Sequence, residues 1–169
     1  YGPDEVEKTL PAFKTVEFGK TTQITKDCQI TFYPSGHILG ASIILLKMAD
    51  KQFLFTNDLG RSNHPLLVPP ASPPAEGIDV VITESTYGDR IHEDLPDLFG
   101  KQLNDAIKRG GKILIPAFAV DRTEVILMKL RELIDQGVIP QIPIYVDSPM
   151  ALKALDYYRQ AINEGSAEI

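Results

Sequence analysis

A glycine-flanked loop has the sequence Ser-Gly-His-Ile-Leu-Gly-Ala-Ser at residues 35–42 and lies between two β-rich runs. It places a histidine, His37, just after a predicted strand. A second loop, Thr-Asn-Asp-Leu-Gly at residues 56–60, follows another apolar run and places Asp58 21 residues after His37. Imidazole is a common zinc ligand, and a carboxylate can bridge two metal ions. The two loops therefore indicate a metal site, provided that they converge.

The residues alone leave this interpretation open. A hydrogen-bonded loop histidine and a turn aspartate both occur widely in proteins without a metal. Two protein ligands are also too few, because a catalytic zinc usually takes three and a water. The other histidines do not complete the set: we predict that His64 faces solvent and that His92 belongs to a solvated polar turn. We therefore expect this chain to contain only part of an active site.

Composition limits the class of protein. The chain has 169 residues, of which 43% are hydrophobic and 24% are charged, as in soluble globular domains. A net charge of −6 argues against a general nucleic-acid coat protein but leaves a local basic groove open. No apolar run is long enough to cross a membrane. The lone cysteine, Cys28, excludes an internal disulfide, which favours a reducing compartment and predicts a cytoplasmic protein.

The first half of the chain is predicted to be mostly β-structure. Residues 14–33 are rich in β-branched and aromatic side chains, which predicts two or three short strands. Residues 42–48 and 52–56 are predicted to form a hairpin. Pro3 followed by acidic residues predicts the start of a helix, and the proline-rich residues 65–74 predict a non-helical surface loop.

In the second half, strands alternate with helices. A buried strand is predicted at 78–83, with further strands at 112–116 and 142–147. Helices are predicted near 93–109 and 120–136. Such alternation predicts a parallel sheet with right-handed crossovers. The fold class is therefore α/β, with an α+β first half.

Polar residues at the ends of these elements are candidates for function. Glu84 follows the predicted strand at 78–83, where it could orient a metal-bound histidine, act as a base or belong to a polar turn. Arg122 and Ser148 lie at predicted helix N-termini, which suit phosphate, and Ser148 precedes a proline as an N-cap does. Asp121 could instead be an ion-pair partner of Arg122.

The order of five segments resembles the β-CASP branch of the metallo-β-lactamase superfamily, RNA-processing nucleases that use two zinc ions. Residues 35–42 resemble its third metal motif, and Thr-Asn-Asp-Leu-Gly-Arg at 56–61 resembles its fourth. Thr-Glu-Ser-Thr-Tyr-Gly at 83–88 resembles the acidic first motif of the β-CASP branch. Residues 116–124 are similar to the start of the β-CASP domain, and residues 145–151 to a recurring segment within it.

This resemblance implies roles for individual residues. His37 would bind one zinc ion, and Asp58 would bridge two as part of the catalytic centre. Glu84 would be the β-CASP carboxylate, which positions a metal-bound imidazole. Arg122 and Ser148 would bind substrate by contacting RNA phosphates in a cleft between domains.

The chain departs from the family pattern in two ways. Asp121 replaces a glycine that usually precedes the arginine, which puts the local backbone shape in question. The main metal motif, His-x-His-x-Asp-His, and the later β-CASP histidine motifs do not appear. The resemblance thus implies an internal portion of a longer enzyme. Residues 1–100 would be the second half of a metallo-β-lactamase αββα sandwich, and residues 101–169 the opening portion of a parallel-sheet β-CASP domain.

The implied function is zinc-dependent hydrolysis of RNA phosphodiester bonds by the intact protein, with this chain alone inactive. Exonuclease and endonuclease activity both remain open, as does a homodimer. Three alternatives are a non-catalytic β-CASP scaffold in an RNA-processing complex, a metallo-hydrolase of small molecules, and an α/β binding module without metal. The last alternative predicts that His37 and Asp58 lie far apart.

Overall fold

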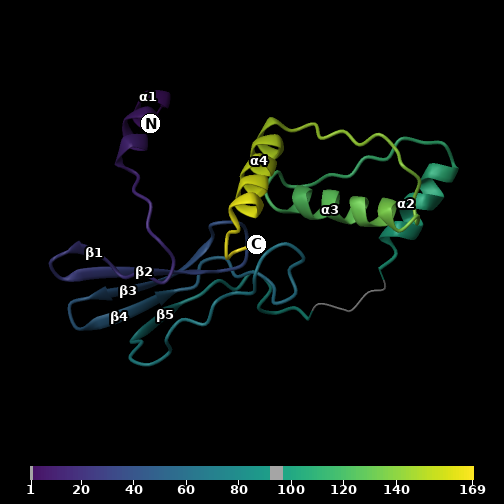
Figure 1. Ribbon diagram of the computed structural model, residues 1–169. Helices are drawn as coiled ribbons and strands as arrows, with labels where there is room; N and C mark the ends of the chain where they lie inside the picture. The colour runs from purple at the N-terminus through teal and green to yellow at the C-terminus, as the bar shows by residue number, and fades with distance from the viewer. Residues whose placement is uncertain (1, 92–96) are drawn as a thin grey trace.

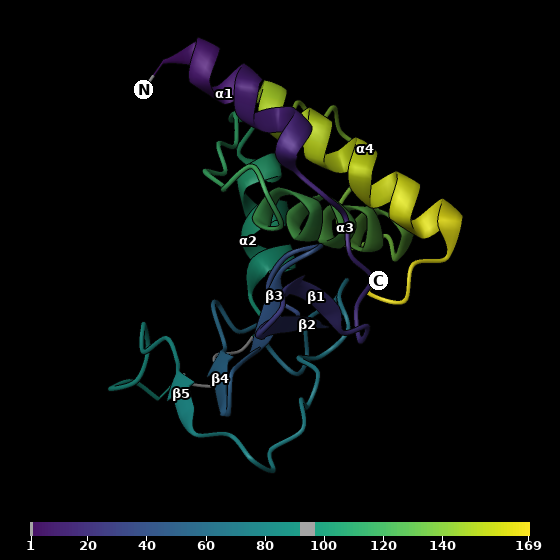
Figure 2. The same cartoon turned by 90° about the vertical axis from the view of Figure 1, so that its left-hand side faces the viewer.

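A computed structural model describes residues 2–91 and 97–169, which form a short N-terminal helix, then a sheet, then further helices (Figure 1). The elements are α1 (Pro3–Thr9), a 3-10 helix η1 (Leu10–Ala12), β1 (Thr22–Thr25), β2 (Cys28–Pro34), β3 (Ser42–Met48), β4 (Lys51–Phe55), β5 (Val80–Ile82), α2 (Phe99–Lys108), α3 (Arg122–Asp135) and α4 (Pro149–Glu164). In Figure 1 the sheet lies on one side and α2 and α3 on the other, and in both views the segment after α4 returns toward the sheet (Figures 1 and 2). The predicted mixed α/β class is confirmed.

The five strands form one sheet in the order β1-β2-β3-β4-β5. Neighbours are antiparallel except β4 and β5, which are parallel. Since β2, β4 and β5 run in the same direction, the loops that follow them all lie where these strands end. We call this side of the sheet, with residues 35–41, 56–60 and 83–88, the loop edge; it is distinct from the edge strands β1 and β5. The sequence order of the strands thus fixes where the candidate residues gather.

The predicted hairpin is confirmed as β3 and β4. Its turn passes through Ala49 with a φ of 54°, and the Ala49 N–H donates to the carbonyl of Asp27 in the neighbouring turn at 2.8 Å. This turn lies at the opposite edge from the loops, because β3 begins at the loop edge with Ser42 paired to Pro34. The proline-rich segment at 65–74 is non-helical, as predicted.

The prediction of a buried strand at 78–83 is wrong as to burial. The strand β5 forms, but Val80, Val81 and Ile82 are 42%, 57% and 44% exposed. The reason is that β5 is the edge strand, and no element within the described part of the chain covers it. Glu84 still follows this strand, as the sequence indicates.

The hydrophobic core cluster belongs to α2, α3 and the segment after α3. Its buried members are Leu103, Leu130, Leu133 and Ile139. The predicted helices are confirmed, and their observed starts are Phe99 and Arg122. The predicted helix residues 93–96 and the predicted polar turn at His92 lie outside the described residues.

The predicted strands at 112–116 and 142–147 are wrong, because neither segment is a strand. A strand requires a hydrogen-bonded neighbour, and neither segment has one among residues 2–91 and 97–169. Pro116 and Pro143 also lack the N–H that a ladder needs. These segments therefore form no parallel sheet in the described chain.

Helix α4 begins as its sequence predicts. The Ser148 hydroxyl accepts a hydrogen bond from the Ala151 N–H at 3.2 Å, and Pro149 occupies the first helical position. The buried face of the helix consists of Ala151, Ala154 and Tyr158. Within the described residues, every helix is too short or too polar to cross a membrane.

Removing the N-cap of α4 should destabilise the protein. We expect Ser148→Ala to lower the free energy of unfolding by about 1 kcal/mol, since a first-turn N–H loses its acceptor. Ser148→Asn should stay close to the original because asparagine also caps. Urea unfolding followed by circular dichroism measures both, and an unchanged midpoint for the alanine variant would contradict the cap.

Candidate metal and RNA site

The loops that carry His37 and Asp58 are in direct contact. The Gly60 N–H donates to the carbonyl of Ser35 at 2.8 Å. A Cβ atom at Gly60 would lie 1.8 Å from the Gly36 carbonyl oxygen and 2.6 Å from the His37 nitrogen, so only glycine fits there. The two motifs that the sequence singled out therefore meet backbone to backbone at the loop edge.

Asn57 shapes the second of these loops. It has a φ of 50°, in the left-handed region that asparagine tolerates better than most residues. Its side-chain amide donates to the Ser42 carbonyl at 2.8 Å, which ties the loop to the start of β3. The residue before Asp58 is thus fixed by both its backbone conformation and its side chain.

Glu84 joins the same group. Its Oε1 accepts from the Leu59 N–H at 3.1 Å, and its Oε2 accepts from the Thr86 N–H at 3.3 Å. The Thr86 hydroxyl, followed by these N–H groups, lowers the pKa of Glu84, and the nearby His37 lowers it further. Glu84 is therefore an ionised carboxylate at neutral pH. It is hydrogen-bonded to the backbone of Leu59, the residue that follows Asp58.

The described residues offer part of a metal centre. His37 and Asp58 are both exposed and supply imidazole and carboxylate, the donors that zinc takes. In residues 2–91 and 97–169, no three His, Cys, Asp or Glu side chains are grouped so that they could hold a metal ion. These two side chains could therefore supply part of the ligands of a zinc site, but they do not complete one.

A second polar group lies between the sheet and the helices. His64 Nε2 is 2.7 Å from Asp121 Oδ2, and the His64 side chain is only 10% exposed. His64 Nδ1 accepts from the N–H groups of Leu66 and Leu67 at 3.1 and 3.0 Å. Because Nδ1 accepts, the proton is on Nε2, which donates to Asp121. The prediction that His64 faces solvent is wrong, since both nitrogens of its ring form hydrogen bonds within the protein.

Tyr158 completes the link from Asp121 to the His37 loop. Its hydroxyl donates to Asp121 Oδ1 at 3.0 Å and accepts from the Leu39 N–H at 3.3 Å. Burial, and then the charge of Asp121, raise the pKa of Tyr158, so the hydroxyl keeps its proton. Asp121 forms no ion pair with Arg122 in the described structure, contrary to the alternative drawn from the sequence, because both its oxygens are engaged.

Glu124, in the first turn of α3, is buried with no good partner. It is 4% exposed, and neither carboxylate oxygen has a well-formed hydrogen bond among the described residues. Burial raises the pKa of Glu124. The backbone N–H groups of Glu124 and Asp121 offset part of this, and the charge of Asp121 adds to it. The neutral form of Glu124 is therefore favoured.

Arg122 and Ser148 lie in different places. Arg122 is exposed beside a hollow of about 560 Å³, which it lines with Pro116, Ala117 and Phe118. Ser148 precedes Tyr158 by ten residues of α4, about 15 Å along a helix. Ser148 is therefore at the end of α4 that points away from the loop edge (Figure 1).

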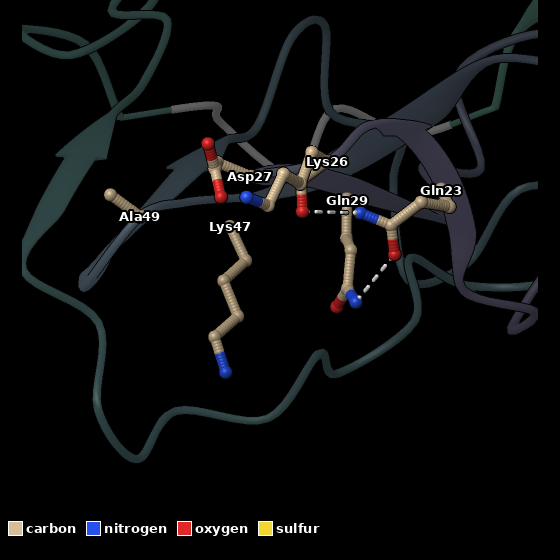
Figure 3. A pocket seen from close by; sticks show the side chains of 6 residues that line it. All are labelled: Gln23, Lys26, Asp27, Gln29, Lys47 and Ala49. Carbon is tan, nitrogen blue, oxygen red and sulfur yellow. Dashed lines mark hydrogen bonds between the residues drawn. The ribbon is translucent and has the colours of Figure 1, made fainter.

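A smaller hollow of about 180 Å³ lies beside the β1–β2 turn, at the edge of the sheet opposite the loop edge (Figure 3). It is lined by Gln23, Lys26, Asp27, Gln29, Lys47 and Ala49. Gln29 donates to the Gln23 side chain there at 2.8 Å. None of the candidate residues lies in this hollow, so it is separate from the site.

Sequence reasoning missed the roles of His64, Glu124 and Tyr158. One signal for Tyr158 was its spacing from Ala151 and Ala154, which predicts one helix face. One signal for the group was Asp121 itself, an acid where the family pattern has glycine. Nothing in the sequence showed that Asp121 would contact His64, 57 residues earlier.

The buried carboxyl of Glu124 should make stability depend on pH. Above its ordinary value of 4.5, Glu124 ionises in the unfolded chain while the folded protein keeps it neutral, so stability falls as pH rises toward the raised pKa. We expect Glu124→Gln to remove this loss and to be more stable than the original at pH 7.

Urea midpoints between pH 4.5 and 7.5 measure this effect. Glu7→Gln, at an exposed acid on α1, serves as the matched control and should follow the original protein. Parallel curves for the original and Glu124→Gln would show that Glu124 does not change its protonation on unfolding.

No protein-family model matches the chain. It is similar to the ribonuclease TTHA0252 of Thermus thermophilus, with 32% identity over 100% of this chain and 39% of that protein. It is 36% identical to endoribonuclease ysh1 of Emericella nidulans over 91% of this chain and 18% of the relative. It is 30% identical to an RNase J-like protein of Methanocaldococcus jannaschii over 96% of this chain and 39% of the relative.

These similarities cover nearly the whole chain, although the chain spans only 39%, 18% and 39% of the three relatives. They agree with the resemblance carried by the motifs at 35–42, 56–61 and 83–88, whose loops meet at one edge of the sheet. This chain therefore belongs to the β-CASP branch of the metallo-β-lactamase superfamily.

Proposed function

We propose that this chain serves the metal-dependent hydrolysis of RNA phosphodiester bonds, with other parts of the whole protein completing the metal centre. The observation that carries the proposal is the packing of Gly60 against the Gly36–His37 peptide, which places a histidine motif and an aspartate motif side by side. The names of the relatives, a ribonuclease and an endoribonuclease among them, support RNA as the substrate.

Zinc is the metal we propose, with two ions in the whole protein. His37 would hold one ion and Asp58 would bridge the pair, because a neutral imidazole and a carboxylate suit zinc. Bound zinc lowers the pKa of water to about 7 and stabilises negative charge on phosphate oxygens.

Glu84 acts in this proposal by orientation and not as a base. Hydrogen bonds from Thr86 and Leu59 lower its pKa, which makes it a weaker proton acceptor. An ionised carboxylate is well suited to accept a hydrogen bond from the free N–H of a metal-bound imidazole. The electrostatic interaction between Glu84 and His37 is consistent with this role.

Arg122 is the residue we propose for phosphate contact. It is exposed at the first turn of α3, where free N–H groups and the helix dipole favour an anion. Its guanidinium has a planar set of donors that matches phosphate oxygens. Phosphate contact by Ser148 stays a prediction, and its hydroxyl already accepts a hydrogen bond in the N-cap of α4.

Substitutions at the loop edge should abolish cleavage in the whole protein. We expect Asp58→Asn to lose both RNA cleavage and bound zinc, because a bridging ligand is weakened. Glu84→Gln should lower cleavage on the order of 10- to 100-fold. Cleavage of an end-labelled RNA and zinc content by atomic absorption measure these effects.

Asp50→Asn is the matched control, since Asp50 is an exposed acid in the hairpin turn at the opposite edge. Full activity in Asp58→Asn would refute the site. A zinc-loaded original protein that cleaves no RNA would favour the scaffold alternative, and turnover of thioesters or lactams in its place would favour the small-molecule hydrolase.

Arg122 should affect RNA binding through charge. We expect Arg122→Gln to weaken binding about tenfold and to reduce the dependence of log affinity on log salt by about 1. Fluorescence anisotropy with labelled RNA at several salt concentrations measures both quantities. Arg131→Gln, at an exposed arginine of the same helix, is the control, and equal effects of the two substitutions would mean that Arg122 contributes only general charge.

A further inference from the structure

Asp121 has a backbone conformation that a non-glycine residue rarely adopts. Its φ is 71° and its ψ is −50°, close to the strained γ-turn geometry. The family pattern has glycine at this position, which would accept such a backbone without strain. An aspartate persists in such a conformation when its surroundings over-determine it. The side chain must therefore form interactions that compensate.

Both carboxylate oxygens of Asp121 are used, each by a different part of the chain. Oδ2 accepts from His64, which lies in the segment after the Asp58 loop, at 2.7 Å. Oδ1 accepts from Tyr158 on α4 at 3.0 Å. Asp121 is 16% exposed and His64 10%, so solvent screens these interactions little. We call residues 2–91 the sheet half and residues 97–169 the helical half. The Asp121 side chain, at the start of α3, thus forms hydrogen bonds both to the sheet half and to α4.

The hydroxyl of Tyr158 connects Asp121 to the loop that carries His37. A phenol has one hydrogen, and its donation to Asp121 turns the oxygen lone pairs toward other donors. The Leu39 N–H, two residues after His37, uses one of them at 3.3 Å. The Gly40 N–H, the next along the chain, donates to Glu168 Oε1 at 3.0 Å. The loop that carries His37 is therefore tied by its backbone to the helical half.

We propose that Asp121 is a positioning residue, which holds the His37 loop through Tyr158 and the segment after Asp58 through His64. The carboxylate sets how the two metal motifs lie against the helical half without touching metal or substrate. This inference rests on the proposed function for its effect on zinc, whereas the ordering of the loop is independent of any activity.

The test compares three variants of the whole protein with one control. Tyr158→Phe removes only the hydroxyl, and Asp121→Gly removes the carboxylate while accepting the backbone conformation. Asp121→Asn keeps an acceptor for His64 and tolerates a positive φ, so it covers the case in which the glycine variant unfolds. Tyr157→Phe alters the neighbouring tyrosine, which is 67% exposed, and is the matched control.

Hydrogen exchange of the peptide at residues 35–42, followed by mass spectrometry, reports on the loop without requiring activity. We expect exchange to become about fivefold to tenfold faster in Tyr158→Phe and Asp121→Gly, the effect of one lost hydrogen bond. Asp121→Asn should lie between these and the original, and Tyr157→Phe should match the original. Combining Asp121→Gly with Tyr158→Phe should speed exchange little more than either substitution alone, because both break the same series of hydrogen bonds from Asp121 through Tyr158 to Leu39.

Zinc affinity, measured by competition with a coloured chelator, should fall about 10- to 100-fold in the same variants, with kcat for RNA cleavage reduced more than KM. Unchanged loop exchange in Asp121→Gly and Tyr158→Phe would overturn the inference, as would faster exchange with unchanged zinc affinity. If the original protein binds no zinc and cleaves no RNA, the proposed function fails, and the exchange data still decide whether Asp121 orders the loop.

Discussion

The absence of a side chain at Gly60 is the constraint on which the site depends. β2 and β4 are not neighbours, because β3 lies between them, and their ends are therefore about 10 Å apart. The loops after these strands must cross over the start of β3 to bring their polar residues together. They do so with the Gly60 backbone directly against the Gly36–His37 peptide. Any Cβ atom there would force the two loops apart and separate His37 from Asp58.

Environment, more than residue type, determines what each acid near this contact can do. Glu84 accepts hydrogen bonds from Thr86 and Leu59, which keep it ionised and suited to orient a cation or an imidazole. Glu124 is buried without good donors, and burial, with a smaller contribution from the charge of Asp121, raises its pKa and favours its neutral form. Asp121 lies in a nearly buried position and accepts hydrogen bonds from His64 and Tyr158. Three carboxyl groups thus have three different roles.

Features that depend on neighbours in sequence were predictable, and those that depend on distant partners were not. The hairpin of β3 and β4, the N-cap at Ser148 and the apolar faces of α2 and α3 follow from local spacing and turn residues. The convergence of the loops followed from strand direction together with the family resemblance. By contrast, the burial of His64 depends on Asp121, far along the chain, and strands at 112–116 and 142–147 would need neighbours that the described residues do not supply.

Directional polar contacts join the sheet half to the helical half, and this has a physical consequence. The buried residues of the hydrophobic core cluster lie within α2, α3 and the segment that follows α3. Contacts across to the sheet half include the bonds of Asp121 to His64 and of Tyr158 to Leu39. An apolar interface tolerates small slides, whereas a hydrogen bond weakens steeply as its angle and distance change. These hydrogen bonds therefore constrain the position of the His37 loop relative to the helical half more sharply than apolar contact would.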